Sequence, residues 1–592
     1  LLKFNKPILA SLYKTEISNL YYVIDSLTKK NIISKSYFDK LEIKNSTSLK
    51  SVPVKLSNQQ DKIFKKILPY IKSKQYHNFL IHGVPGSGKT EIYIKLAQNA
   101  IANNKSVIVL IPEIILSTQM QGRFKKYFGD SVAIWHSKMT SREKKYTLKK
   151  ISTGEYKIII GARSCIFTPT SNLGLIIVDE EQDSSYKQES PQPYYNARDV
   201  AIMRASFADC PIILTSATPS LESYYNTLIH KTTLLTLKEK YYQSAPPKIE
   251  IINIMNQGPN DKIFSPVLLS AIKETLIDKK QCILLNNRRG YATSIFSKED
   301  KEPLLCKHCN VPMSYHKINN ILLCHYCNLR YSYNSVSSGK DTGNIILNGY
   351  GTEKVYEILD KEFPQSNIAR VDSDSLSTKS KLEKLLNDFS IGKIDIIIGT
   401  QMISKGLDFN NVELVGIINA DHGMFTPDFR SGERTFQIIS QVIGRAGRRE
   451  TRGQAIIQTY NPNNSNLINA IQSNYKSFYA TNLADRNELQ YPPFTRLCRL
   501  TFIGSNIENV LRVAKNITNK LSTSKSLKLL GPAEAPISKI KKHWRINSLI
   551  IASKKNPMEI QEQFISKIGI NILEKKYNQV KIRLDIDPIN ML

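Results

Sequence analysis

The segment FLIHGVPGSGKTEIYIKL has the spacing Gly83-x-x-x-x-Gly88-Lys89-Thr90 between an apolar stretch and an amphipathic one. That context predicts a phosphate-binding P-loop joining a strand to a helix, with a chance glycine-rich turn as the alternative. The glycines let backbone N–H groups close around phosphate oxygens. The lysine would reach the β and γ phosphates and the threonine would hold Mg²⁺. The predicted phosphate-binding residues are Gly83, Val84, Pro85, Gly86, Ser87, Gly88, Lys89 and Thr90.

Two adjacent carboxylates, Asp179 and Glu180, follow the buried-strand pattern LGLIIV. A nucleotide motor needs one carboxylate on the metal and one to orient or deprotonate the attacking water. Adjacent acids at a strand end can also simply cap the next helix. Together with the P-loop, the pair favours nucleotide hydrolysis.

The segment QVIGRAGRR offers Gln441, Arg445 and Arg448. The two arginines are three residues apart and therefore share one face of a helix. Arginine presented from a facing lobe can stabilise charge on a γ-phosphate. An exposed Arg-rich helix is the alternative, but the position after a second series of strands favours a role in hydrolysis.

Four of the eight cysteines form two Cys-x-x-Cys pairs separated by fourteen residues. This is close to the spacing of a four-thiolate zinc ribbon, and it favours one structural Zn²⁺ over four incidental buried cysteines. The predicted zinc ligands are Cys306, Cys309, Cys324 and Cys327.

Short apolar, β-branched stretches alternate with longer amphipathic ones, as in a parallel sheet with crossover helices. Two such series predict an α/β protein with two lobes, interrupted in the second by the Cys-rich block and followed by an α+β domain. The predicted domains are residues 51–235 and 236–460 for the lobes, 301–345 for the zinc-binding insertion within the second lobe, and 461–592 for the C-terminal domain.

The net charge of +31 and the pI of about 9.6 indicate a polyanionic partner, most simply nucleic acid. Dispersed lysines on a solvated face are the alternative. The longest apolar stretches are far shorter than the roughly 20 residues of a membrane span, and the first residues do not form a secretory signal. We therefore expect no membrane contact and a cytoplasmic location.

Several longer strings resemble known helicases. The series GVPGSGKT, DEEQ, TSATPS, GTQMISKGLDF and QVIGRAGR resembles superfamily 2 helicases. More narrowly, DEEQDSSYKQE, NNRRGYA, PDFRSGERTFQ and LDIDPINML are similar to the primosomal protein N′ (PriA) family of bacterial replication-restart helicases. The resemblance runs from about residue 50 to the end of the chain.

The resemblance implies two RecA-like lobes and an ATP- and Mg²⁺-dependent 3′ to 5′ DNA helicase that acts at stalled or abandoned forks. It also implies contacts with single-strand-binding protein and with replicative-helicase loading proteins, by a monomer in the bacterial cytoplasm. Gln60 matches the glutamine that reads adenine, and Gln441 joins the ATP-binding set. The residues matching positions that couple hydrolysis to movement are Gln182, Ser216, Ala217 and Thr218.

Candidate DNA contacts fall into three groups. The residues of the first group match positions in the family that lie near the DNA backbone. The residues of the second and third groups are suggested by their aromatic or basic side chains, because rings and cations suit single-stranded DNA. Packing is the alternative for the tyrosines, and an exposed basic loop for the last group. The residues are Arg163, Thr400 and Gln401, then Tyr194, Tyr195 and Arg198, and finally Lys541, Lys542, Trp544 and Arg545.

The chain departs from the family pattern in three places. The family carries four Cys pairs and two zincs, but the outer positions here are Ser297, Asp300, Ser337 and Lys340, which predicts one zinc. Gln182 replaces the family histidine, so hydrolysis should survive while coupling to movement weakens. Residues 1–50 match only a remnant of the winged-helix region, so poor recognition of DNA 3′ ends is expected unless the chain is a fragment.

Two rival functions follow from these departures. A fork-binding scaffold with an impaired motor would still recruit the helicase loader, although the intact hydrolysis residues argue against it. An RNA helicase or restriction-type translocase would share the motor but gives no reason for the zinc insertion.

Overall fold

The chain divides into two units, residues 1–50 and 51–592. In this computed structural model only Ser26 and Thr28 of the first unit are described, so the predicted winged-helix remnant lies outside the described residues. The described residues of the second unit are 54–112, 118–137, 139–241, 246–254, 263–286, 294–297, 305–308, 313–316, 321–324, 329–332, 345–348, 351–372, 379–400, 403, 409, 411–421, 428–446, 453–522, 527–553, 558–569 and 577–591.

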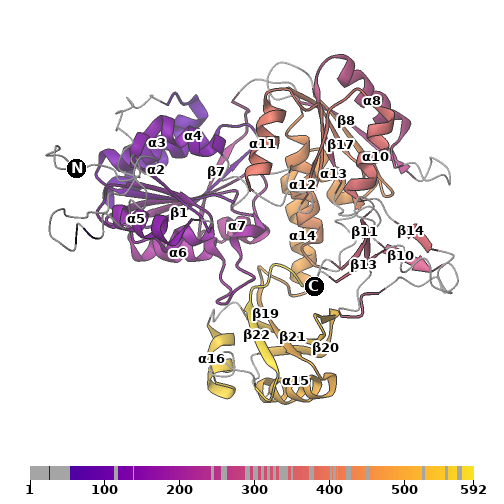
Figure 1. Cartoon of the computed structure of the whole chain (residues 1–592). Coiled ribbons are helices and arrows are strands. Elements are labelled where there is room, and N and C mark those ends of the chain that lie inside the picture. Colours follow the sequence, from indigo (N-terminus) through magenta and orange to yellow (C-terminus); the bar gives the residue numbers. More distant parts are fainter. Residues whose placement is uncertain are drawn as a thin grey trace. The chain divides into compact units, whose positions relative to one another are not determined.

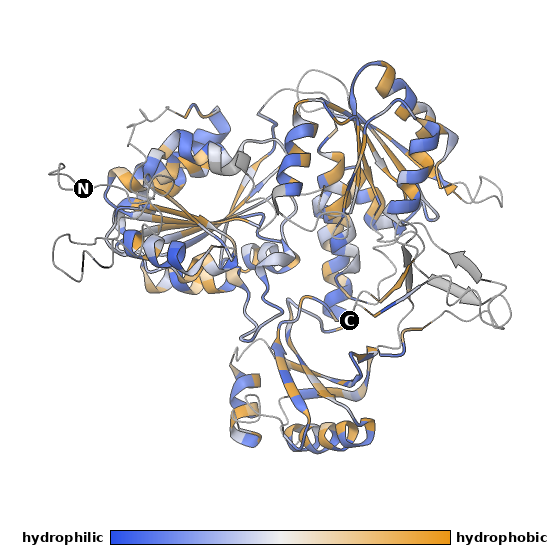
Figure 2. Ribbon diagram, in the orientation of Figure 1, coloured by the Kyte–Doolittle hydropathy of each residue, from blue (hydrophilic) through white to orange (hydrophobic). Residues whose placement is uncertain are grey.

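The first lobe is built on a seven-stranded sheet with the order β3-β4-β2-β5-β6-β1-β7, in which every neighbouring pair is parallel. Most of its strands are buried and β-branched, as expected for a sheet covered on both faces (Figure 2). The strands are β1 His77–Gly83, β2 Ser106–Leu110, β3 Val132–Trp135, β4 Ile158–Gly161, β5 Leu173–Asp179, β6 Pro211–Ser216 and β7 Thr233–Leu237.

Helices cover both faces of this sheet (Figure 1). The helices α2 Asn58–Ser73, α3 Lys89–Ala102 and α4 Thr118–Phe128 cover one face, and α5 Ser141–Ser152, α6 Ala197–Phe207 and α7 Leu221–Leu228 cover the other. Because the strands are parallel, their carboxyl ends lie along one edge of the sheet, where β1 leads into the P-loop and β5 ends at Asp179.

The second lobe repeats this plan with six parallel strands in the order β15-β16-β9-β17-β18-β8. Its strands are β8 Lys248–Asn253, β9 Gln281–Leu285, β15 Ile368–Val371, β16 Ile396–Gly399, β17 Val412–Ile417 and β18 Gln454–Thr459. Its helices are α8 Pro266–Ile277, α10 Thr352–Glu362, α11 Lys379–Ser390 and α12 Ser431–Ile443.

A Cys-rich insertion separates β9 from α10. It contains an antiparallel pair and a three-stranded antiparallel sheet. The pair is β10 Ser294–Ser297 with β14 Ile345–Asn348, and the sheet is β11 Ser314–His316, β12 Ile321–Leu323 and β13 Arg330–Ser332.

The C-terminal domain has a four-stranded antiparallel sheet in the order β20-β21-β19-β22, packed with two helices around a core of its own. Its elements are β19 Thr495–Gly504, α15 Ile507–Ser522, β20 Leu527–Ile540, β21 His543–Ser553, α16 Glu559–Lys567 and β22 Lys581–Ile586. The predicted fold class, two parallel-sheet RecA-like lobes with an inserted Cys-rich region and an α+β C-terminal domain, is confirmed.

Two further helices, α13 Ser465–Ile471 and α14 Tyr475–Glu488, precede β19. The sequence prediction assigned them to the C-terminal domain, but Leu467 and Phe478 are buried in the core cluster of the lobes. The Tyr475 hydroxyl also donates to the Pro219 carbonyl of the first lobe, at 2.9 Å. None of the described helices is both long and apolar enough to cross a membrane.

Candidate active site

The P-loop joins β1 to α3. Gly86 and Gly88 have φ values of +77° and +74°, a left-handed conformation that side chains other than glycine rarely adopt. Gly88 caps the N-terminus of α3, and the Lys89 Nζ donates to the Gly83 carbonyl at 2.9 Å. The lysine side chain is therefore hydrogen-bonded to the backbone at the start of the loop.

Gln60 holds the P-loop from helix α2. Its Nε2 donates to the carbonyls of Ser87 and Gly88, at 3.0 and 3.1 Å, and its Oε1 accepts from the backbone of Ser57 in a capping box. A cavity of about 480 Å³ opens beside the loop, a size suited to a small ligand. Its lining residues are Ser57, Gln59, Ser87, Leu237, Glu239, Lys240, Tyr241 and Pro246.

The predicted carboxylates lie opposite the start of α3. The Tyr93 hydroxyl is 3.0 Å from Asp179 Oδ2 and 3.2 Å from Thr90 Oγ1, so it links the two residues predicted to hold Mg²⁺. Carboxylate and hydroxyl oxygens are ligands that Mg²⁺ accepts, and the pair fits such an ion. Burial raises the pKa of Glu180, and the neighbouring Asp179 charge raises it further, while Lys89 opposes both effects.

Three of the four predicted coupling residues, Gln182, Ser216 and Thr218, form one chain of hydrogen bonds. Gln182 donates from Nε2 to Glu180 Oε2 at 2.6 Å and accepts at Oε1 from the Ser216 hydroxyl, also at 2.6 Å. The Ser216 Oγ in turn accepts from the backbone N–H of Thr218 at 2.9 Å. Ala217 lies between Ser216 and Thr218 in the same segment.

Helix α12 of the second lobe brings its C-terminal end to this site. Gln441 Nε2 lies 3.5 Å from Glu180 Oε2. Gly444 of the second lobe packs against Pro85 of the P-loop, because a Cβ added at Gly444 would lie only 2.9 Å from the Pro85 Cβ. The two lobes therefore touch at the P-loop. Arg445 is buried, and Arg448 lies outside the described residues.

The DNA-contact candidates of the first lobe are partly engaged within the protein. Arg163 donates to the Lys187 carbonyl at 2.9 Å. The half-buried Tyr195 ring packs edge-on against the Phe167 ring, with 5.1 Å between the ring centres. Tyr194 is also half-buried.

Arg198, another predicted DNA contact, is engaged within the first lobe. Its guanidinium pairs with Glu181 Oε2 at 3.0 Å and bonds the Ser220 hydroxyl, so this side chain holds lobe 1 elements together. In lobe 2, Thr400 is buried at the end of β16, and Gln401 lies outside the described residues.

The C-terminal candidates lie at the tip of the β20–β21 hairpin. Lys541 and Lys542 are exposed, whereas Trp544 and Arg545 are half-buried. The Lys539 Nζ lies 4.9 Å from the centre of the Trp544 ring, a cation–π arrangement.

This hairpin contacts the Cys-rich insertion, where the Lys542 N–H donates to the His308 carbonyl at 2.9 Å. Cys306 and Cys324 of that insertion are fully buried beside its small sheet, which suits a thiolate metal site. Cys309 and Cys327 lie outside the described residues, as do Asp300, Ser337 and Lys340 of the predicted lost site.

Three residues at this site were missed by the sequence analysis. Tyr93 is three residues after Thr90, a spacing that puts both on one face of α3. Thr215 is paired in register with Asp179 across the parallel strands β5 and β6. Tyr186 donates to the Asp179 carbonyl at 2.6 Å. Helical spacing was a usable signal for Tyr93, whereas the other two contacts depend on tertiary structure.

Four protein-family models match successive parts of the chain, two of which overlap slightly. They are the DEAD/DEAH box helicase at residues 57–227, the PriA DNA helicase Cys-rich region domain at 306–330, the helicase conserved C-terminal domain at 327–450 and the primosomal protein N C-terminal domain at 487–589. Two of the four are specific to one family of restart helicases.

Curated relatives agree with these matches over nearly the whole chain. The replication restart protein PriA of Bacillus subtilis is 37% identical over 585 residues, which cover 98% of this chain and 72% of that protein. The Chlamydia pneumoniae protein of the same name is 38% identical over 577 residues, covering 96% of this chain and 76% of the relative. The resemblance inferred from the sequence is thereby confirmed, and this chain belongs to the PriA family of replication restart DNA helicases.

Proposed function

We propose that this chain hydrolyses ATP to move 3′ to 5′ along DNA at stalled or abandoned forks, and that it thereby starts reloading of the replicative helicase. The observation that carries the proposal is the contact of Gln441 with Glu180, which brings the second lobe to the hydrolysis residues of the first. A site completed by both lobes links hydrolysis to their relative movement.

Each residue has a role in hydrolysis that follows from its place. Thr90 and Asp179 would hold Mg²⁺, which when bound offsets negative charge on the transferred phosphate. Glu180 orients the attacking water and accepts its proton. Lys89 and Arg445 stabilise charge on the phosphates. We assign the cavity beside Ser87 to the adenine base.

The remaining assignments concern DNA, zinc and partners. The hairpin tip with Lys541 and Lys542 is proposed to bind single-stranded DNA, and its contact with His308 supports one surface shared with the Cys-rich insertion. Four thiolates of that insertion would hold one structural Zn²⁺. Single-strand-binding protein and helicase-loading proteins are the proposed partners of a monomeric chain.

The test measures ATP hydrolysis without nucleic acid, with forked DNA and with RNA. Forked DNA should raise the rate by about tenfold or more, a change of roughly 1.4 kcal/mol in the barrier. RNA should stimulate it far less. Lys89→Ala should abolish hydrolysis, and Lys62→Ala on the exposed face of α2 should not. Partial duplexes with 3′ or 5′ tails then test the polarity of unwinding.

A flat rate on bound DNA would instead support the scaffold function. That alternative is not favoured, because both helicase models match the chain. Gln182, the residue that suggested an impaired motor, also bonds both Glu180 and Ser216.

A further inference from the structure

Both oxygens of the Asp179 carboxylate are held by donors from three places in the first lobe. Oδ1 accepts from the Thr215 hydroxyl and from the backbone N–H of Glu180. Oδ2 accepts from the Tyr93 hydroxyl at 3.0 Å. A carboxylate bound at both oxygens cannot rotate without breaking a buried hydrogen bond.

The two side-chain donors stand on rigid elements. Tyr93 and Thr215 are fully buried, one on α3 and the other on β6, beside the strand that ends in Asp179. Groups held by packed helices and strands keep their geometry better than groups on loops. The orientation of Asp179 is therefore set by the core of the lobe.

Tyr93 also reaches the second predicted metal ligand, with 3.2 Å between its hydroxyl and Thr90 Oγ1. A tyrosine hydroxyl has one hydrogen, so it donates to one acceptor at a time. With that hydrogen given to the Asp179 carboxylate, the Thr90 hydroxyl is the donor to the Tyr93 oxygen. One phenol thus fixes the positions of both ligands relative to each other.

We propose that Tyr93 and Thr215 are positioning residues, which preset Asp179 and Thr90 for the Mg²⁺-nucleotide complex. The inference rests on the proposed ATPase function. Neither residue is assigned a contact with substrate, since Thr215 acts through Asp179 and Tyr93 acts through Asp179 and Thr90. Groups that orient metal ligands typically change metal affinity about 10- to 100-fold when they are removed.

The test uses a fluorescent, non-hydrolysable ATP analogue and follows its binding as Mg²⁺ is raised from micromolar to millimolar. Tyr93→Phe and Thr215→Val remove one hydroxyl each with little change in shape. Each should raise the half-saturating Mg²⁺ concentration by about tenfold. Binding of the analogue in EDTA should be unchanged, because the P-loop is intact.

Two controls separate positioning from general damage. Thr215→Ser keeps the hydroxyl and should restore the wild-type Mg²⁺ dependence. Tyr70→Phe, on helix α2 of the same lobe, should leave it unchanged. Thermal unfolding of each variant checks the fold, and Thr215→Ala replaces Thr215→Val if the valine variant does not fold.

Wild-type Mg²⁺ dependence in folded Tyr93→Phe and Thr215→Val would overturn the positioning role while leaving the proposed ATPase intact. Absence of any Mg²⁺-dependent nucleotide binding by the wild-type chain would overturn the proposed function together with this inference.

Discussion

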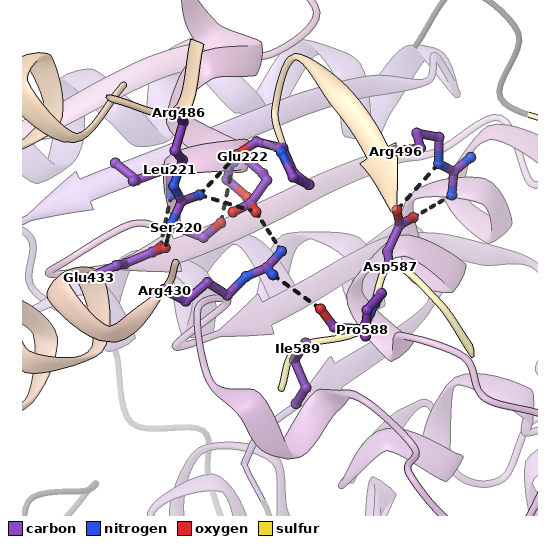
Figure 3. A network of polar contacts seen from close by, with 12 residues as sticks. Ser220, Leu221, Glu222, Arg430, Glu433, Arg486, Arg496, Asp587, Pro588 and Ile589 are labelled. Carbon is purple, nitrogen blue, oxygen red and sulfur yellow. Dashed lines mark hydrogen bonds and ion pairs between the residues drawn. The ribbon is translucent and has the colours of Figure 1, made fainter. Parts of the chain in front are cut away.

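The Glu222 carboxylate on α7 of the first lobe lies 2.8 Å from the guanidinium of Arg430, which precedes α12 of the second (Figure 3). Arg486 of α14 lies 3.4 Å from the same carboxylate and 2.6 Å from that of Glu433. Glu433 also accepts from the Leu221 N–H at 3.0 Å. We call Glu222, Arg430, Glu433 and Arg486 the interlobe cluster, because it joins elements of both lobes.

The interlobe cluster predicts a pH-dependent contribution to stability. Burial raises the pKa of Glu222, but Arg430, Arg486 and Arg198 outweigh burial and hold it at about 2. The folded pKa is below that of the unfolded chain, so the stabilisation is complete above about pH 4.5 and is lost as pH falls toward 2. Glu222→Gln should therefore lower the free energy of unfolding by about 3 kcal/mol at pH 7.

Urea unfolding of Glu222→Gln and wild type at several pH values measures this difference. The difference in the free energy of unfolding between the two proteins should become smaller as pH falls below about 4.5. Glu155→Gln is the matched control, since that carboxylate is 57% exposed and its pair with Lys150 should contribute little. A gap that stayed constant with pH would contradict the assigned ionisation.

Residues 585–591, which comprise the last two residues of β22 and the segment after it, contact both lobes. Lys187 of the first lobe, which is buried, lies 2.8 Å from Asp585 and donates to the Ile586 carbonyl at 2.6 Å. Arg430 of the second lobe donates to the Pro588 carbonyl at 3.1 Å (Figure 3). The C-terminal domain is therefore bonded to both helicase lobes.

Deleting residues 588–592 should loosen the second-lobe side of this connection. The deletion removes the carbonyls that accept from Arg430 and Arg434, while the Lys187 contact with Asp585 remains. Amide hydrogen exchange should rise about tenfold or more at the start of α12 and stay unchanged in α3, because local opening depends on local contacts. Unchanged exchange in α12 would show that the segment does not hold this helix.

The positions of the P-loop and of the strand-end carboxylate were predictable from the sequence, because each occupies one short segment. Contacts that depend on strand register or lobe packing were not predictable. Thr215 meets Asp179 only because β5 and β6 are neighbours, although 36 residues separate them. Likewise, the place of Arg198 in an aromatic-rich loop did not predict its pairing with Glu181, a partner 17 residues away.

Gln182 is expected to couple a change in the position of the Glu180 side chain to residues 216–218. Gln182→Ala and Ser216→Ala each break the chain of hydrogen bonds between them, so each should reduce DNA-stimulated ATP hydrolysis by about tenfold. Because both variants remove the same connection, the double variant should lose little more than either single one. Basal hydrolysis and DNA affinity serve as controls. Fully additive losses would show that the two residues act separately.

Zinc removal should change the Cys-rich insertion and the hairpin that it contacts. Metal analysis of protein purified without chelator should find one zinc per chain, because only one set of four cysteines is present in the predicted site. Two zincs, or none, would contradict the prediction. Cys306→Ser should lose the metal, whereas the buried Cys282→Ser in β9 should keep it.

Since Lys542 donates to the His308 carbonyl, loss of the metal should also raise hydrogen exchange at Lys542. It should weaken binding of single-stranded DNA several-fold if the insertion and the hairpin tip form one surface. ATP hydrolysis without DNA should be unchanged, because the P-loop and Asp179 belong to the first lobe and not to the insertion. Loss of basal hydrolysis on zinc removal would instead show that the insertion supports the motor directly.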